Sequence, residues 1–561
     1  MCSAPFCFFG ELLPVGNTGN ETEVRRRNDQ GRCLPGMNKK YDIVVVGAGN
    51  AGLSAALHCA KEGKKVLLIE QHNLPGGCAT SFVRGRFEFE PSLHELCDIG
   101  PEDDPAEIRE MMNEYGVKID WKMVPDCFRI ITKYSDGSPM DVTMPSGKQP
   151  FIDKMEYYVP GCRAKMEEYF ELLEETMAGT AYISASNGHA DSSVLKAKYP
   201  NLLRTGSYPV KKVWNAMKIP QKCQDILSTY WGYLGIDMEH MAFIHYCNMF
   251  MKYVTRAAYI PAHTSHEISC KMVERLRELG GDVWFNCRAE EFLFSGDRLC
   301  GVKTTSGVVD CDYVLANINP DIIYAKMMPK DLIPEREKKL SAARNHNYSA
   351  RMFTVYVGLN KTAEELGIKD YCIFMADTSD SAQEYKNILG GYEKNNFTIF
   401  LCNNITNPEA SPEGTSIGFF TSMGNREEWG NLSEEDYVAY KNRYAKKFIK
   451  ELKEKAGIDI APYIEEICVA TPWTFARYLG TPEGSVYGYE TKDWDGMMAR
   501  MMMLSSDYPI KGLRPIGAAG PRGDGYSSAY VCGKLMARLA LKDLKEEAPG
   551  DPAANKEGGA Q

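Results

Sequence analysis

Residues 42–77 carry the pattern that most constrains how this chain folds. Residues 43–46 form a short β-branched run, which is typical of a buried parallel strand. A helical pattern follows at 53–61, and a second apolar run at 66–69 ends in Glu70. Between the first run and the helix stand three glycines in the spacing G-x-G-x-x-G: Gly47, Gly49 and Gly52. Strand, glycine turn, helix, strand and acid in this order predict a βαβ unit that binds a dinucleotide.

Each part of this unit has a physical role. Gly47 permits the tight turn, Gly49 lets the backbone approach a pyrophosphate, and Gly52 allows close packing of helix and strand. The helix N-terminus, which includes Asn50 and Ala51, offers free N–H groups and the positive end of its dipole to phosphate. Glu70 is placed to accept hydrogen bonds from an adenosine ribose, and its charge would repel the 2′-phosphate of NADP.

Three further segments extend the pattern. Paired glycines, Gly76 and Gly77, follow the acid and suggest another close approach of the backbone to a ligand. Residues 268–316 are predicted to form a helix, a strand, a hairpin-like pair and a closing apolar strand. Residues 512–544 repeat the order of strand, glycine-rich turn and helix. No second complete G-x-G-x-x-G unit with its own acid follows, so we expect no separate domain for NAD(P)H.

Composition limits the class of protein. A chain of 561 residues with 44% hydrophobic and 25% charged residues predicts a globular protein with more than one core. The net charge of −10 does not support binding to nucleic acid, and no apolar stretch is long enough to predict a membrane span. The 18 cysteines are scattered, which favours buried reduced thiols and a cytoplasmic location. Peripheral contact with a membrane is compatible with this composition.

The two ends lack periodic patterns. Residues 1–37 have no basic segment before their apolar patch, so we expect a disordered extension and not a secretory signal. Residues 548–561 are expected to form a disordered tail.

Together these segments resemble the phytoene desaturase, carotenoid isomerase and retinol saturase family of the flavin amine-oxidase-like superfamily. The likeness extends from about residue 41 to 545 and is dense in short motifs. The motifs are Phe89-Glu90-Pro91-Ser92-Leu93-His94, Tyr259-Ile260-Pro261, Asn407-Pro408-Glu409-Ala410-Ser411-Pro412-Glu413-Gly414, Thr471-Pro472 through Phe475, and Gly484-Ser485-Val486-Tyr487-Gly488. The chain departs from the family at Ser92, at Cys78, and at 262–266, where the family usually has glycines.

The resemblance implies an α/β fold: a Rossmann-like FAD-binding domain of the glutathione-reductase/amine-oxidase type with an inserted α+β substrate domain. The FAD-binding domain would comprise residues 38–100, 255–325 and 465–547. The substrate domain would comprise 101–254 and 326–464, including a helix at 105–115. Besides the residues of the first unit, the implied FAD contacts are Gln71, Gly76, Gly77, Cys78, Ala79, Ala289, Gly520, Asp524, Ser527 and Ser528.

A flavin carries the redox chemistry, so the protein has to orient the substrate and manage one proton. A long apolar substrate calls for an apolar cavity, and the Met- and aromatic-rich segments 231–233, 248–251 and 497–503 could line it, although Met also fills ordinary cores. The candidates for the proton are His263, His94 and Tyr487, with His266 as a further histidine. His263 and His266 lack a nearby third ligand, so we expect no metal site.

Three functions remain open. The favoured one is an FAD-dependent oxidoreductase that desaturates, saturates or isomerises C=C bonds of a long apolar polyene- or lipid-like molecule, with an unknown electron donor or acceptor. The second is a flavin oxidase of an amine or another polar compound. The third is a flavin-free binding protein like the Rab escort and GDP-dissociation-inhibitor proteins, which share this fold. The intact phosphate glycines and Glu70 argue against the third.

Overall fold

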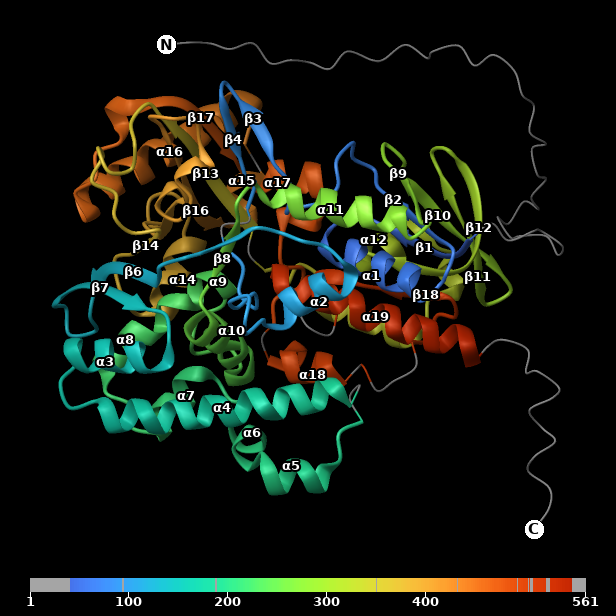
Figure 1. Ribbon diagram of the computed structural model, residues 1–561, viewed down its shortest axis with the longest axis horizontal. Helices are drawn as coiled ribbons and strands as arrows, with labels where there is room; N and C mark the ends of the chain where they lie inside the picture. Colours follow the sequence, from blue (N-terminus) through green and yellow to red (C-terminus); the bar gives the residue numbers. More distant parts are fainter. Residues whose placement is uncertain are drawn as a thin grey trace.

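The computed structural model describes residues 41–92, 95–186, 189–349, 351–430, 432–491, 493–502, 504, 508–520 and 525–546. The expected terminal extension and tail therefore lie outside the described residues. Figure 1 shows two lobes, each built around one sheet.

The first sheet contains the predicted βαβ unit. Its central strand β1 (Tyr41–Val46) pairs in parallel with β2 (Val66–Ile69) and with β12 (Gly307–Ala316). The parallel part continues through β9 (Asp282–Trp284) beside β2 and β18 (Leu513–Pro515) beside β12. The antiparallel strands β10 (Ala289–Ser295) and β11 (Arg298–Thr304) extend the β12 side. Strand β2 is buried along its whole length, as expected for a sheet covered on both faces.

Helices α1 (Asn50–Lys61), α11 (Ser265–Glu278) and α19 (Tyr526–Glu546) share one core with this sheet (Figure 1). Helix α2 (Glu107–Tyr115) packs into the same core through Ile108, Met111, Met112 and Tyr115. The sequence placed this helix in the substrate domain, and that placement was wrong. Its buried face is complementary to the dinucleotide-side core, which the helical periodicity alone does not reveal.

The second sheet has the order β17-β13-β16-β15-β14-β6-β7. All neighbours are antiparallel except β14 and β6, which are parallel. The bounds are β6 (Asp126–Lys133), β7 (Pro139–Pro145), β13 (Arg351–Leu359), β14 (Cys372–Met375), β15 (Thr398–Cys402), β16 (Ser416–Gly424) and β17 (Ile464–Ala470). The sequence assigns residues 465–470 to the FAD-binding domain. In the structure they form β17, which pairs with β13 and so belongs to the second sheet.

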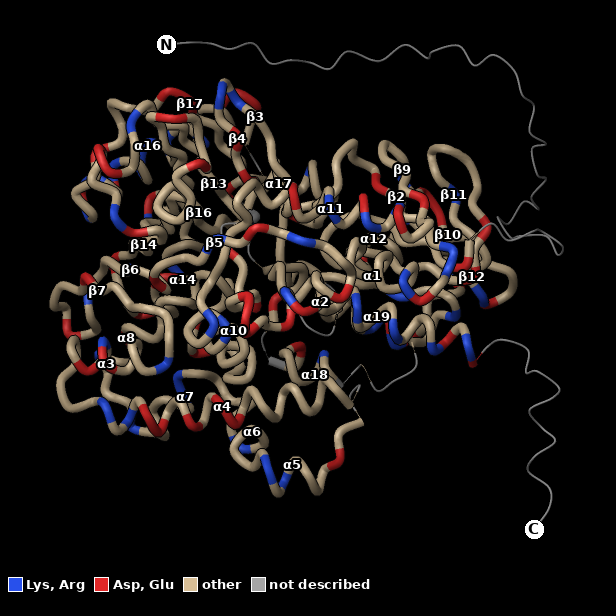
Figure 2. The backbone as a smooth tube through the Cα atoms, in the orientation of Figure 1, with Lys and Arg blue, Asp and Glu red and all other residues tan. Residues whose placement is uncertain are grey.

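Helix α16 (Glu434–Ala456) packs on one face of the second sheet, and a larger set of helices packs on the other. The remaining helices are α3 (Lys148–Tyr158), α4 (Arg163–Ala185), α5 (Ser192–Lys198), α6 (Pro200–Thr205), α7 (Val210–Ala216), α8 (Gln221–Leu227), α9 (Trp231–Leu234), α10 (Phe243–Arg256), α12 (Pro320–Ile322), α13 (Glu335–Arg344), α14 (Ser381–Leu389), α15 (Arg426–Gly430), α17 (Pro472–Leu479) and α18 (Met497–Met502). In the described part of the chain, no helix is both long and apolar enough to cross a membrane. Figure 2 shows acidic and basic residues interspersed over both lobes.

Two small ribbons connect the lobes. The hairpin of β3 (Phe82–Arg84) and β4 (Phe87–Phe89) places two phenylalanines in the core of the second lobe, while Glu88 between them is exposed. Strand β5 (Trp121–Met123) pairs with β8 (Tyr259–Pro261). The chain thus passes between lobes several times, which places residues from distant segments at the boundary.

Candidate functional site

The glycine turn after β1 has the geometry that its sequence predicts. Gly47 adopts a φ of +96°, and a Cβ on Gly52 would stand 1.9 Å from the carbonyl oxygen of Gly47. Helix α1 begins at Asn50 without a side-chain cap. The buried Oδ1 of Asn50 has no hydrogen-bond partner among the described residues. This turn therefore presents uncapped N–H groups at a helix start, the arrangement that binds phosphate.

The paired glycines lie beside this turn. Gly76 forms a parallel bridge with Gly49, and its N–H donates to the carbonyl of Ala48 at 2.8 Å. Gly76 has a φ of +114°, and a Cβ there would stand 1.9 Å from the oxygen of Ala79. Gly77 approaches the Cα of Gly49. Two glycine segments, 47–52 and 76–77, therefore lie together although they are 24 or more residues apart in the chain. We call them the glycine cradle, because their glycines let a ligand approach the backbone.

Glu70 directly follows β2, and its side chain accepts a hydrogen bond from the backbone of the glycine turn. Its carboxylate accepts the N–H of Ala48 at 2.7 Å and the N–H of His72 at 2.8 Å. Burial raises the pKa of Glu70, and these backbone donors oppose that effect. The carbonyl of Glu70 accepts from Cys287, just before Ala289 begins β10. Gln71 is exposed.

The C-terminal glycine segment lies against the first turn. Gly517 has a φ of +90°, and a Cβ there would stand 2.3 Å from Oδ1 of Asn317. Asn317, which follows β12, also lies 2.8 Å from where a Cβ on Gly49 would stand. The sequence analysis missed Asn317, and its position directly after an apolar strand was the available signal. Gly520 ends this segment, and Asp524 lies outside the described residues.

The start of α19 lies next to the paired-glycine segment. The hydroxyl of Tyr526 donates to the carbonyl of Cys78 at 3.2 Å and shares a hydrogen bond of 2.5 Å with Ser92. Ser527 donates to the carbonyl of Cys97 at 2.8 Å. Ser269 donates to the carbonyl of Ala79 at 2.8 Å. The helix start is thereby fixed beside the cradle.

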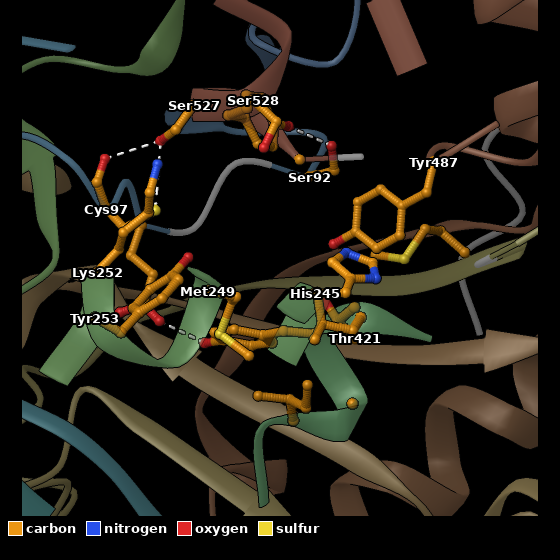
Figure 3. Close-up of a pocket in the computed structure, with 18 of the residues that line it drawn as sticks. Ser92, Cys97, His245, Met249, Lys252, Tyr253, Thr421, Tyr487, Ser527 and Ser528 are labelled. Atoms are coloured by element: carbon orange, nitrogen blue, oxygen red, sulfur yellow. Dashed lines mark hydrogen bonds between the residues drawn. The ribbon is translucent and has the colours of Figure 1, made fainter. Parts of the chain in front are cut away.

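A cavity of about 1230 Å³, including its part open to solvent, adjoins the start of α19 (Figure 3). Its apolar lining comes from α9, α10, α18 and the second sheet. These side chains are Leu234, Met249, Met352, Phe397, Ile399, Leu401, Met423 and Met497. Ser92, Ser527 and Ser528 line it on the side of the first lobe. Of the predicted Met-rich segments, Met249 and Met497 line the cavity, whereas Met251 and Met501 are buried in cores.

Polar side chains interrupt the apolar lining. Tyr233 donates its hydroxyl to Oε1 of Glu95 at 2.6 Å. Lys252 forms an ion pair with Asp98. His245 shares a hydrogen bond of 2.9 Å between its Nδ1 and the hydroxyl of Thr491. Burial raises the pKa of Glu95 to about 8, so this carboxyl group is mostly neutral at pH 7.

Of the three residues predicted to transfer a proton, Tyr487, His263 and His94, the described part of the chain places only Tyr487 at the cavity. Tyr487 lines the cavity, and Figure 3 shows its ring near His245. His263 is exposed after β8 and is not part of the cavity lining, so its catalytic role finds no support in the geometry. His94 lies outside the described residues. His266 lies within 3.2 Å of the Thr80 hydroxyl and 3.3 Å of the Cys270 sulfur, away from the cavity lining.

The sequence analysis missed Glu95, Lys252 and His245. Glu95 follows a recognised motif directly, and Lys252 and His245 stand on the amphipathic helix that also carries Met249. These were weak signals, because a polar residue beside a motif or on a helix face is usually solvated.

Comparisons with known proteins agree with this geometry. The family described as an NAD(P)-binding Rossmann-like domain matches residues 45–115. The chain is 26% identical over 494 residues to an all-trans-retinol 13,14-reductase of Danio rerio, covering 82% of this chain and 79% of the relative. It is 23% identical over 546 residues to a neurosporene-forming phytoene desaturase of Rhodobacter capsulatus, covering 90% and 95%.

The solved structure of putrescine oxidase bound to putrescine matches with a TM-score of 0.59 at 15% identity, covering 90% of this chain and 99% of that one. This likeness shows the fold. The predicted fold class, a Rossmann-like dinucleotide-binding domain with an inserted α+β domain of the amine-oxidase type, is confirmed. The resemblance of this chain to the phytoene desaturase, carotenoid isomerase and retinol saturase family is likewise confirmed, over most of its length.

Proposed function

We propose that this protein is an FAD-dependent oxidoreductase that acts on carbon–carbon double bonds of a long apolar, polyene- or lipid-like substrate. The observation that carries the proposal is the largely apolar cavity beside the start of α19, next to the glycine cradle. The named relatives, a retinol reductase and a phytoene desaturase, support the same substrate class.

Several described residues of the chain are suited to hold FAD. Its pyrophosphate would lie against the glycine cradle and the start of α1, where added Cβ atoms would collide with the backbone. Its ribose would meet Glu70, and its adenine the backbone near Ala289. The start of α19, with Ser527 and Ser528, would stabilise negative charge on the flavin ring. When bound, FAD supplies hydride transfer at its ring.

The residues of the chain then have three tasks. The apolar side chains of the cavity align the substrate and exclude water. The strand pairs β3–β4 and β5–β8 would hold the two lobes together, so that the cavity stays beside the cradle. One polar group must hold or release a proton. An amine substrate is less well supported, because the surface that lines the cavity is mostly apolar.

Three further features stay predictions: a separate electron donor or acceptor of unknown identity, peripheral contact with a membrane, and a cytoplasmic location. The proposed reaction does not depend on any of them.

A visible absorption spectrum of the purified protein tests the proposal. We expect a flavin spectrum that bleaches on anaerobic reduction. If the enzyme saturates C=C bonds, all-trans-retinol added in detergent should accept a hydride and restore the spectrum of the oxidised flavin; if it desaturates, phytoene should donate a hydride and bleach the oxidised flavin. The products, including isomers, are then identified by chromatography. A protein that stays colourless after incubation with FAD, or one that neither exchanges a hydride with either polyene nor isomerises it, would contradict the proposal.

A further inference from the structure

We propose that Glu95 is the acid that gives a proton to the substrate, and that the cavity is therefore built to saturate a C=C bond. The inference rests on the proposed function and deepens it, because it names the proton donor and the direction of the reaction.

The position of Glu95 supports this role. Its side chain is only 6% exposed and forms part of the cavity wall. The hydroxyl of Tyr233 donates to Oε1 at 2.6 Å, whereas Oε2 is buried without a hydrogen-bond partner among the described residues. A neutral carboxylic acid fits this arrangement, because its carbonyl oxygen accepts from Tyr233 and its O–H is not engaged by any other described residue.

The surroundings keep this carboxyl group neutral. The titratable groups around it are largely uncharged phenols and thiols: Tyr233 of α9, Tyr253 of α10, Cys372 of β14, Cys127 of β6 and Cys97. Lys252, which lines the same cavity, forms an ion pair with Asp98. Burial is the main cause that raises the pKa of Glu95 to about 8. The acid form therefore predominates at neutral pH, as a general acid requires.

A second buried acid provides a contrast. Burial also raises the pKa of Glu90 to about 8. Its Oε1 accepts the N–H of Ser265 at 2.8 Å, at the start of α11, and Glu90 is not part of the cavity lining. Glu90 therefore stabilises a helix end, whereas Glu95 stands where substrate would bind. A glutamine at either position retains an acceptor oxygen and nearly the same volume.

The proposed step is balanced. The O–H bond of Glu95 breaks and its proton forms a C–H bond at one alkene carbon. The neighbouring carbon takes up a hydride, whose two electrons come from reduced flavin, and the C=C π bond is lost. Proton and hydride together add one H₂ across the bond. The carboxylate that remains on Glu95 is then protonated again from solvent.

Glu95→Gln tests the inference, with Glu90→Gln as the matched control. The flavin of each full-length holoenzyme is reduced anaerobically and mixed with all-trans-retinol, and reoxidation is followed by absorbance. We expect Glu95→Gln to slow reoxidation by retinol at least about 100-fold, while reoxidation by ferricyanide is unchanged. Glu90→Gln should leave both rates near those of the wild type. In D₂O, the wild type should place one deuterium at the protonated carbon.

A further readout does not depend on turnover. Infrared difference spectra between pH 6 and pH 10 should show the titration of several buried carboxyl groups, and Glu95→Gln should lack one band that Glu90→Gln retains. Tyr233→Phe, which removes the hydrogen bond to Oε1 and the one that the same hydroxyl shares with the Cys372 sulfur, should slow reoxidation by retinol about tenfold and serves if Glu95→Gln does not fold. A Glu95→Gln enzyme that retinol reoxidises at the wild-type rate would overturn the inference and leave the proposed function intact. A wild-type flavin that phytoene reduces but retinol does not reoxidise would overturn the inference alone. A wild-type enzyme that neither exchanges a hydride with retinol or phytoene nor isomerises either one would instead overturn the proposed function, and the inference with it.

Discussion

Gly533 of α19 lies directly against Ala51 of α1. A Cβ on Gly533 would stand 2.1 Å from the carbonyl oxygen of Ala51, a distance that no side chain can occupy. The two helices can therefore pack this closely only with glycine at position 533. This contact fixes the first turn of α1, which would bind the pyrophosphate, relative to the helix that starts beside the cavity.

Gly533→Ala should displace α19 from α1 and weaken both stability and cofactor binding. The expected loss is about 1–3 kcal/mol in the free energy of unfolding, the usual cost of overpacking a core. Urea unfolding and the FAD content after purification measure the two effects. Lys545→Ala, an exposed change on the same helix, is the control and should leave both values unchanged. A fully loaded Gly533→Ala protein of wild-type stability would contradict the role of this contact.

The cradle could be predicted from the sequence because its geometry is local. Gly47, Gly52 and Glu70 lie within one βαβ unit, and their spacing already determines which backbone atoms face the phosphates. The cavity could not be predicted in the same way. Glu95 and Tyr233 are 138 residues apart, and they meet only because the chain crosses between the lobes. The role of His263 stays a prediction: this histidine beside a motif is exposed and is not among the residues that line the cavity.

Glu70→Ala should lower the affinity for FAD. The substitution leaves the N–H groups of Ala48 and His72 without their carboxylate acceptor, and it removes the acid that would bind the ribose. We expect at least a tenfold rise in the dissociation constant of FAD, or about 1.4 kcal/mol or more. Fluorescence titration of the apoprotein with FAD measures it. Glu62→Ala, at an exposed position after α1, should bind FAD like the wild type.

Met249→Trp should block the cavity without disturbing the flavin. Met249 lines the cavity from α10 and contacts the apolar core at its edge (Figure 3), so a larger ring there would occupy the space needed by a long substrate. We expect reoxidation by all-trans-retinol to fall at least tenfold, while the flavin spectrum and reoxidation by ferricyanide stay unchanged. Met123→Trp is the control, because Met123 is 55% exposed. Equal loss in both variants would show that the cavity is not the substrate site.

Stability should fall as the pH rises from about 5 to 9. Glu90 and Glu95 have folded-state pKa values near 8, whereas a glutamate in an unfolded chain titrates near 4.5. A raised pKa means that the folded protein holds these protons more tightly, so the stability they contribute is fully present below about pH 4.5 and is lost as the pH passes through about 8. Each unit of raised pKa corresponds to about 1.4 kcal/mol, so the two groups together would account for several kcal/mol.

Glu90→Gln cannot ionise and should flatten this decline. Urea unfolding at pH 6 and pH 9 compares the two proteins: the destabilisation of Glu90→Gln relative to the wild type should shrink, or change sign, at pH 9. An equal difference at both pH values would mean that Glu90 is already ionised in the folded protein at pH 6.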